Sequence, residues 1–188
     1  MRRHAQFAIV AIIAISLAHL LDPWAWTQLE KPGVYDRDFG RMLRVIGFLP
    51  LWLLLAAALW LQTRDHRRAL LLALTPALGG LVAEVLKILL RRERPGLHDG
   101  EYYFRPYADQ FFSTRVLALP SSHALVAFSG TLLLCKLYPR AWPVWLAFGI
   151  GCALTRLQAH AHFLSDVIVA GVAAYLTVEL VWRRWGRA

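Results

Sequence analysis

The stretch TRLQAHAHFLSD, residues 155–166, places ionisable side chains between two apolar runs. Such groups are costly in apolar surroundings unless they are paired or used. If a helix begins near His162, Asp166 lies four residues later on the same face, so its carboxylate can hold the imidazole ring. An oriented, neutral imidazole is a base or a nucleophile. The spacing therefore selects His162 over His160, and the competing interpretation is a structural histidine and aspartate at a helix entrance.

The chain around this stretch is too apolar for an ordinary soluble domain, since 58% of its 188 residues are hydrophobic and only 18% are charged. Several of the apolar runs are shorter than the roughly 20 residues of a perpendicular span, so we expect their ends to lie in the interface or in polar cavities. The sequence predicts an all-α, polytopic membrane protein that forms one domain over residues 1–188. Its six predicted transmembrane helices cover residues 5–21, 45–61, 69–90, 122–138, 142–157 and 163–182.

The positive charge of the chain, formally +9, lies in short clusters between apolar runs rather than along one polar face. That distribution argues against nucleic acid as a partner. Six crossings put both termini on one side, together with compact basic clusters near residues 2–3, 64–68, 136–140 and 183–187. Basic residues next to helix ends favour the cytoplasm, although the opposite side also carries basic residues mixed with acids. We therefore expect a multi-pass protein of the inner or plasma membrane.

Three polar clusters occur at the ends of these predicted helices. Crossings alternate in direction, so all three clusters are expected at the same membrane face, which the charge pattern assigns to the periplasm or the exterior. The first ends the third run, the second opens the fourth, and the third joins the fifth to the sixth. They are Lys87 with Arg94-Pro95; Pro120-Ser121-Ser122-His123; and Arg156 with His162 and Asp166.

The basic members of these clusters predict an anion-binding cavity. Lys87, Arg94 and Arg156 bring three permanent charges together, which is costly unless an anion balances them. Guanidinium groups match the oxygens of a tetrahedral phosphate. Ser121 is the expected N-cap of a helix, so the backbone N–H groups of the next two residues can point at the same anion. Phosphate is therefore the predicted ligand. Glu84 lies one turn before Lys87 and is expected to pair with it.

Two histidines then have distinct chemical roles available. His162, held by Asp166, can attack phosphorus and form a phosphohistidine while the electrons of the broken bond go to the leaving oxygen. His123 can protonate that oxygen and afterwards activate the water that cleaves the phosphoenzyme. The basic side chains would stabilise charge on the equatorial oxygens. This scheme needs neither a metal ion nor another cofactor, and the sequence offers no obvious carboxylate cluster for Mg²⁺.

In this order and spacing, the three clusters resemble the tripartite signature of the type 2 phosphatidic acid phosphatase (PAP2) family. The motifs span residues 87–166, and the expected helix count is also similar to that of the family's six-helix membrane members. The resemblance implies metal-independent hydrolysis of a phosphate ester or pyrophosphate through a phosphohistidine. Two positions depart from the family pattern: Ser122 stands where glycine is usual and Thr155 where serine is usual. Ser122 either crowds the phosphate or donates it another hydrogen bond, and both Ser121 and Ser122 are candidate phosphate ligands.

The expected substrate is a lipid phosphate or pyrophosphate whose tails stay in the bilayer. Undecaprenyl pyrophosphate, phosphatidylglycerol phosphate, phosphatidic acid and a lipid A phosphate all fit, and the sequence does not choose among them. A phosphotransferase that passes the phosphate to a second lipid would use the same residues. The same charges would also suit a transporter or flippase that only binds anionic lipids, or a phosphatase of soluble phosphate esters. The sequence leaves the oligomeric state open.

Further polar residues and two loops are expected near the predicted site. Arg91 and Arg92 either bind a second phosphate or meet lipid headgroups. The loop at residues 22–44 is expected to hold a short interfacial helix or to form a lid over the headgroup. The polar and aromatic loop at residues 96–119 is expected to cover the outer mouth of the site.

Overall fold

The computed structural model describes residues 2–186, with side chains from residue 5 onward. Its regular elements are helices, and no strand occurs within residues 2–186, so the all-α prediction is confirmed. Two isolated β-bridges join Arg92 to Phe104 and Glu93 to Leu117. The helices are α1 (Arg2–Gln28), α2 (Asp38–Val45), α3 (Leu49–Thr63), α4 (His66–Leu90), α5 (Ser122–Leu137), α6 (Trp142–Gln158) and α7 (Leu164–Val181), with short turns η1 (Pro95–Leu97), η2 (Pro139–Ala141) and η3 (Trp182–Gly186).

The long helices agree with the six predicted apolar runs to within a few residues, except at the end of α1. We expected the first loop to begin at residue 22, but α1 continues through Pro23 to Gln28. A proline inside a helix leaves the carbonyl four residues earlier without its usual donor. Here that carbonyl belongs to His19, and the Tyr102 hydroxyl lies 3.5 Å from it. This contact with Tyr102 helps α1 to continue past Pro23, whereas the sequence pattern predicts an end at residue 21.

Three helices are long and apolar enough to cross a membrane: α1, α4, and α7 together with η3. The pair α2 and α3 also passes as a span when taken together, but it is bent by 71°. The remaining two long helices, α5 and α6, have 16 and 17 residues and are short for a perpendicular crossing. Three or four candidate spans are therefore shown, and the six crossings stay a prediction.

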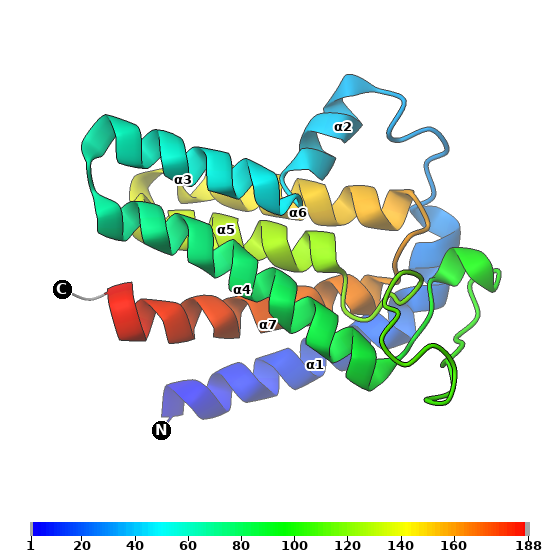
Figure 1. The fold of residues 1–188 in the computed structure, drawn as a ribbon. Helices are drawn as coiled ribbons and strands as arrows, with labels where there is room; N and C mark the ends of the chain where they lie inside the picture. Colours follow the sequence, from blue (N-terminus) through cyan, green and yellow to red (C-terminus); the bar gives the residue numbers. More distant parts are fainter. Residues whose placement is uncertain (1, 187–188) are drawn as a thin grey trace.

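Helix α5 occupies the centre of the bundle, where it packs against α4, α6 and α7, while α3 packs on α4 and α1 packs on α7 (Figure 1). Small residues allow these close approaches. A Cβ atom at Gly130 of α5 would lie 2.4 Å from the Trp52 ring of α3, and one at Gly79 of α4 would lie 2.4 Å from Ser129 Oγ. Buried alanines such as Ala83 and Ala124 fill the core between them.

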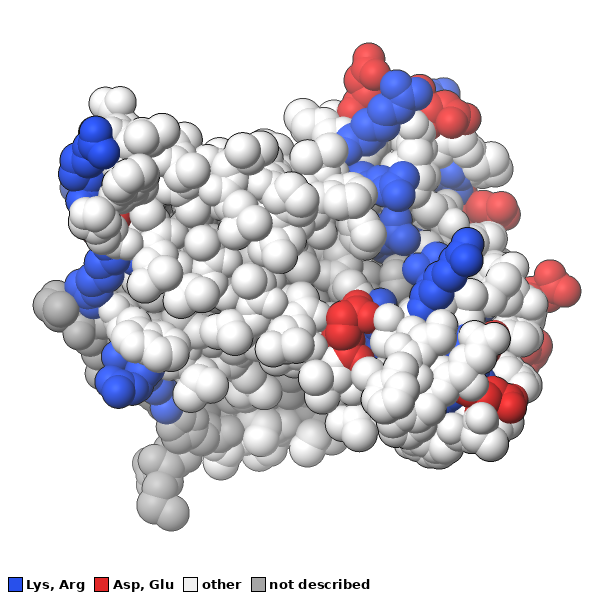
Figure 2. Space-filling model, in the orientation of Figure 1, with Lys and Arg blue, Asp and Glu red and all other residues white. Residues whose placement is uncertain are grey.

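Alternate helices run in opposite directions, with α1, α4 and α6 one way and α3, α5 and α7 the other (Figure 1). The C-terminal end of α4, the start of α5 and the junction of α6 with α7 consequently lie at one end of the molecule, and both chain ends lie at the other. Charged side chains gather at these two ends and leave an uncharged band between them (Figure 2). The predicted meeting of the three polar clusters at one end is confirmed. The Arg2 and Arg3 side chains and Arg187, predicted for the opposite end, lie outside the described residues.

Candidate functional site

Backbone contacts bring the three motif segments together at the end of the bundle. The segment before α5 lies against the start of α7, since Ser121 N donates to the backbone oxygen of Asp166 at 3.2 Å. Ser121 is also the N-cap of α5, and its hydroxyl accepts from Ala124 N at 3.4 Å. Arg156 occupies the last turn of α6, a few residues before the chain turns into α7. Residues that are distant in sequence thus lie close together at this end of the bundle.

His162 is buried, with 4% of its surface exposed, and lies two residues before α7 begins at Leu164. Its Nδ1 atom is 3.0 Å from the backbone oxygen of Ala118 and 3.7 Å from Asp166 Oδ2. The nearer acceptor is therefore the carbonyl, with the expected aspartate close behind it. Since Nδ1 faces two acceptors, it carries the proton, and Nε2 keeps a free lone pair.

The charge state of His162 follows from its surroundings. Burial lowers its pKa to about 4, and the charges of Arg156 and Lys87 act in the same direction against the opposing effect of the Asp166 carboxylate. The imidazole is therefore neutral at physiological pH. A neutral ring with a free Nε2 is the form that a nucleophile needs.

Asp166 is fully buried and performs two structural tasks besides facing His162. Its Oδ2 atom accepts from Phe163 N at 2.7 Å and so caps the first turn of α7. Its Oδ1 atom pairs with the Arg92 guanidinium. The same carboxylate thus fixes the start of α7 and the residue that precedes it, which holds the backbone next to His162 in place.

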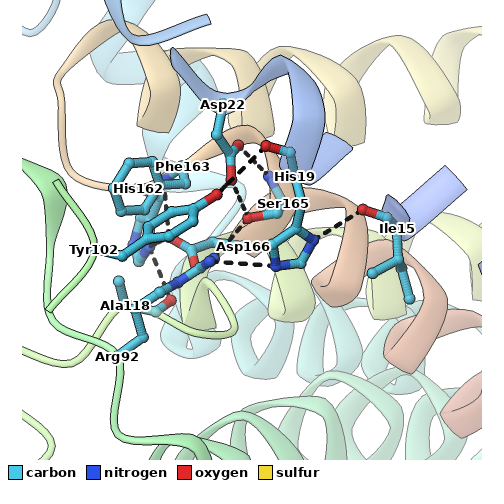
Figure 3. Close-up of polar contacts among 10 residues, drawn as sticks. All are labelled: Ile15, His19, Asp22, Arg92, Tyr102, Ala118, His162, Phe163, Ser165 and Asp166. Atoms are coloured by element: carbon cyan, nitrogen blue, oxygen red, sulfur yellow. Dashed lines mark hydrogen bonds and ion pairs between the residues drawn. The ribbon is translucent and has the colours of Figure 1, made fainter. Parts of the chain in front are cut away.

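A buried polar network extends from Asp166 to helix α1 (Figure 3). Arg92 also donates to Ser165 Oγ at 2.6 Å. Ser165 in turn donates from its backbone N–H and its hydroxyl to Asp22 of α1, at 2.8 and 2.5 Å. Tyr102 donates to Asp22 at 2.6 Å, and burial raises the pKa of Tyr102 to about 12, with Asp22 acting in the same direction, so the phenol stays a donor. The network ties α1 to the start of α7.

The interpretation that Arg91 and Arg92 bind a second phosphate or lipid headgroups is wrong. Each is only 1% exposed. Arg92 is held by Asp166 and Ser165, while Arg91 donates to the backbone oxygens of Arg105 at 3.0 Å and Pro106 at 2.8 Å. Arg91 therefore stabilises the loop after α4. Its guanidinium donates to backbone carbonyls of that loop, which lie outside any helix or sheet.

The predicted cationic residues differ in whether an acid or a hydrogen-bond acceptor pairs with their charged groups. Lys87 pairs with Glu84 at 3.1 Å, as expected, and Arg156 donates to the Tyr35 hydroxyl at 2.8 Å. Within residues 2–186, the buried Nε atoms of Arg94 and Arg156 have no hydrogen-bond partner, and neither guanidinium meets a carboxylate. Burial lowers the pKa of the Arg94 guanidinium, and the nearby charge of Arg156 lowers it further. These groups form a buried positive cluster in which Lys87 alone has a carboxylate partner among the described residues.

His123 belongs to the same cluster. It occupies the first turn of α5, and its Nε2 atom is buried without a partner among the described side chains. The positive charges that act on its ring come from Arg156, Arg44 and Lys87. An anion bound beside it would satisfy both the unpaired nitrogen and the surrounding charge.

Comparison with known proteins shows the family of the chain. The sequence profile of the PAP2 superfamily matches residues 68–188, which is more than half of the chain. The chain belongs to the PAP2 superfamily. Two relatives named lipid A 1-phosphatase, from Rhizobium johnstonii and Rhizobium etli, are each 33% identical to it over 101 residues. The matched region covers 53% of this chain but only 40% and 42% of the two relatives. No solved structure matches the chain significantly.

Both departures from the PAP2 pattern have a structural account. Ser122 donates to Glu84 Oε1 at 2.8 Å, the same oxygen that pairs with Lys87. Its side chain is therefore directed to the carboxylate in this structure. Thr155 donates to the backbone oxygen of Cys152 at 2.7 Å, within its own helix, so its hydroxyl serves α6.

His160 is occupied away from the PAP2 motif residues. It has a positive φ of 50°, its ring stacks on Trp26 at 3.6 Å, and its Nε2 atom lies 2.9 Å from the backbone oxygen of Trp26. The choice of His162 over His160 is thus consistent with the geometry. Sequence reasoning missed Asp22 and gave Arg92 the wrong partners, because nothing in the local pattern reveals contacts with residues more than 70 positions away.

Proposed function

We propose that this chain is a membrane phosphatase that cleaves a lipid phosphate or pyrophosphate through a phosphohistidine at His162. One observation carries the proposal: a buried, neutral His162 with a free Nε2 lies in a cluster of positive groups that has too few anions. Lys87, Arg94 and Arg156 supply those charges. A tetrahedral phosphate would balance the charges and place phosphorus beside the nucleophile.

In the first chemical step, His162 Nε2 attacks phosphorus and the bond from phosphorus to the leaving oxygen breaks. The electron pair goes to that oxygen, and His123 supplies its proton. The bound phosphate offsets the positive charges around His123 and so favours its protonated form. His123 then takes a proton from water, which attacks the phosphohistidine and releases phosphate.

The positive groups stabilise the transition state in this scheme. Charge spreads over the three equatorial oxygens as the phosphoryl group moves, and fixed donors in a dry cavity bind that distribution more strongly than water does. Arg94, Arg156 and the backbone N–H groups at the start of α5 are such donors. Asp166 and its capping contacts hold the segment that carries the nucleophile.

A lipid is the proposed substrate because the helix ends that carry the cluster lie at one end of the uncharged band, where tails can remain in the bilayer (Figures 1 and 2). The two relatives named lipid A 1-phosphatase support a lipid phosphate. The proposed location is the inner or plasma membrane, with the site at the extracytoplasmic face. The candidates are undecaprenyl pyrophosphate, phosphatidylglycerol phosphate, phosphatidic acid and a lipid A phosphate.

The first prediction tests the nucleophile. His162→Asn should lower phosphate release from the preferred lipid by roughly 10³-fold or more, because the covalent route is lost. The assay is a panel of phospholipids and polyprenyl phosphates with EDTA present, in the absence of a second acceptor lipid. Trapping with ³²P-labelled substrate should give a phosphoenzyme in the wild type and none in His162→Asn.

The matched control is His160→Asn, which removes a neighbouring histidine that contacts Trp26 instead of the motif residues. It should retain phosphoenzyme formation. Undiminished phosphate release by His162→Asn with every lipid would overturn the proposed function. In a separate incubation with an added acceptor lipid, label transfer to that lipid with no free phosphate would replace hydrolysis by phosphotransfer. Binding without any phosphoenzyme would indicate a carrier.

A further inference from the structure

Arg44, in the last turn of α2, belongs to none of the three sequence motifs and precedes the residues matched to the PAP2 superfamily, 68–188. Its guanidinium carbon lies 4.7 Å from the centre of the Tyr35 ring and 5.7 Å from that of Phe48. Its Nε atom is buried and has no hydrogen-bond partner among the residues that the structure describes. A half-buried guanidinium held between two aromatic rings is positioned, yet its charge is not paired.

The two rings place Arg44 beside two groups of the proposed site. Phe48 packs against His123 with ring centres 4.8 Å apart. Tyr35 accepts a hydrogen bond from Arg156 at 2.8 Å. The backbone at Gly47 also lies close to His123, since a Cβ atom at Gly47 would be 2.8 Å from the Cβ atom of His123. The turn between α2 and α3 therefore packs directly against His123.

The acids near Arg44 do not neutralise it. Asp38, in the first turn of α2, lies 3.6 Å from Arg41 and is exposed. Within residues 2–186, no carboxylate lies within ion-pair distance of the Arg44 guanidinium. Arg44 acts on the His123 ring as a positive charge, together with Arg156 and Lys87. The end of α2 next to His123 thus carries a positive charge that no carboxylate of the described residues balances.

We propose that Arg44 binds the phosphate of the leaving group and so makes the site selective for lipid diphosphates over lipid monophosphates. This inference rests on the proposed function, in which His123 protonates the leaving oxygen. The leaving group must then lie at His123, and Arg44 is the cation that α2 contributes there, against the Phe48 ring that also packs on His123. A lipid monophosphate leaving from a diphosphate carries negative charge, whereas an alcohol leaving from a monophosphate does not.

Cleavage of a lipid diphosphate uses the same two chemical steps as the hydrolysis proposed above. His162 Nε2 bonds to the terminal phosphorus, and the bond from this phosphorus to the bridging oxygen breaks. The electron pair and the proton of His123 go to the bridging oxygen, so a lipid monophosphate departs with its remaining charge against Arg44. Water then converts the phosphohistidine to free histidine and inorganic phosphate.

The test compares a polyprenyl diphosphate with the monophosphate of the same chain in the same detergent micelles. Arg44→Gln should lower kcat/KM for the diphosphate by about 10- to 100-fold, the range for losing a hydrogen bond to a charged group. The monophosphate value should fall at least ten times less. Arg44→Lys should recover part of the loss, because it restores the charge without the planar fork.

Arg37→Gln is the matched control, since it removes one positive charge from an exposed side chain immediately before α2. It should leave the diphosphate-to-monophosphate ratio unchanged. Equal losses on both substrates in Arg44→Gln, or no loss on either, would overturn the role of Arg44. Wild-type protein that acts on neither of these lipids but releases phosphate from a lipid monophosphate of the first panel would overturn the selectivity for diphosphates. Release from no lipid at all would instead overturn the proposed function.

A measurement on wild-type protein covers the case in which Arg44→Gln does not fold. Inorganic pyrophosphate presents two linked phosphates, and inorganic phosphate presents one. Pyrophosphate should inhibit the wild type with a Ki at least ten-fold lower than that of phosphate. Equal inhibition constants would contradict a second phosphate subsite.

Discussion

At the scale of single residues, the neutral state of His162 follows from its burial and not from a proton relay to Asp166. The backbone oxygen of Ala118 is the nearest acceptor of Nδ1, at 3.0 Å. A carbonyl fixes the tautomer without titrating, so the free Nε2 does not depend on the ionisation of the aspartate. The carboxylate meanwhile neutralises Arg92, which would otherwise be a buried, unpaired charge.

The titration of His162 gives the next prediction. Its pKa of about 4 lies below the ordinary value of 6.5, so the ring should stay neutral, with its proton on Nδ1, down to about pH 4. The unfolded chain binds a proton on this residue at higher pH than the folded protein. The contribution of His162 to stability is therefore fully present above pH 6.5 and is lost as the pH falls toward 4.

The measurement is ¹⁵N NMR of histidine-labelled protein in detergent between pH 4 and 8. The signal that disappears in His162→Asn identifies the residue. A midpoint near 6.5 for that signal would contradict the buried, neutral ring. The other histidines serve as internal references in the same spectra.

At the scale of elements, α1 reaches the proposed site although none of its residues belongs to a motif. Asp22 is 1% exposed and accepts the backbone N–H of Ser165, an end group of α7 that the helix itself cannot satisfy. The extension of α1 beyond Pro23 makes this contact possible, since residue 22 then lies within the helix. The start of α7 is thus fixed by a helix at the other end of the sequence.

Asp22→Ala should therefore lower stability and activity together. It leaves the buried backbone N–H and hydroxyl of Ser165 without the acceptor that they have in the wild type, which costs about 1–3 kcal/mol for each group left unsatisfied. We expect a lower midpoint of thermal unfolding, followed by tryptophan fluorescence in detergent, and slower phosphoenzyme formation at temperatures where the variant is folded. The control Asp109→Asn changes an exposed acid and should behave as the wild type.

An unchanged unfolding midpoint in Asp22→Ala would show that α1 does not brace the start of α7. A lower midpoint with normal phosphoenzyme formation in the folded protein would separate stability from positioning. Asp22→Asn retains one acceptor oxygen and should give an intermediate effect on both measurements.

At the scale of the whole molecule, the charge distribution defines two charged ends and an uncharged middle (Figure 2). The proposed site occupies the end opposite the chain termini (Figure 1). The basic residues at the terminal end, including Arg67, Arg68 and Lys136, lie close to helix ends, which favours the cytoplasm for that side.

Orientation gives the last prediction. A cysteine placed at Glu101, in the loop at the site end, should react with a membrane-impermeant maleimide in intact spheroplasts. A cysteine at Arg140, in the turn between α5 and α6, should react only after lysis. Both positions are exposed, and wild-type protein measures the background from Cys135 and Cys152. The opposite labelling pattern would contradict an extracytoplasmic site.

The sequence alone determined the helical class, the approximate limits of the long helices and the meeting of three polar clusters at one end. These features depend on local composition and on the alternation of helix direction, both of which can be read along the chain. The choice of His162 over His160 also came from spacing within one short segment. The predicted roles of Lys87, Arg94 and His123 remain predictions, although the structure places them in one cluster.

Only the tertiary structure decided the partners of these residues. Asp22, Arg92 and Arg44 reach the site from segments whose contacts span the sequence, such as the 143 positions between Asp22 and Ser165. A buried ion pair or an unpaired guanidinium depends on which side chains the packing brings together and on how much water it removes. Local pattern gives neither quantity, so the sequence predicts the wrong partners for Arg92 and gives no sign of the position of Arg44.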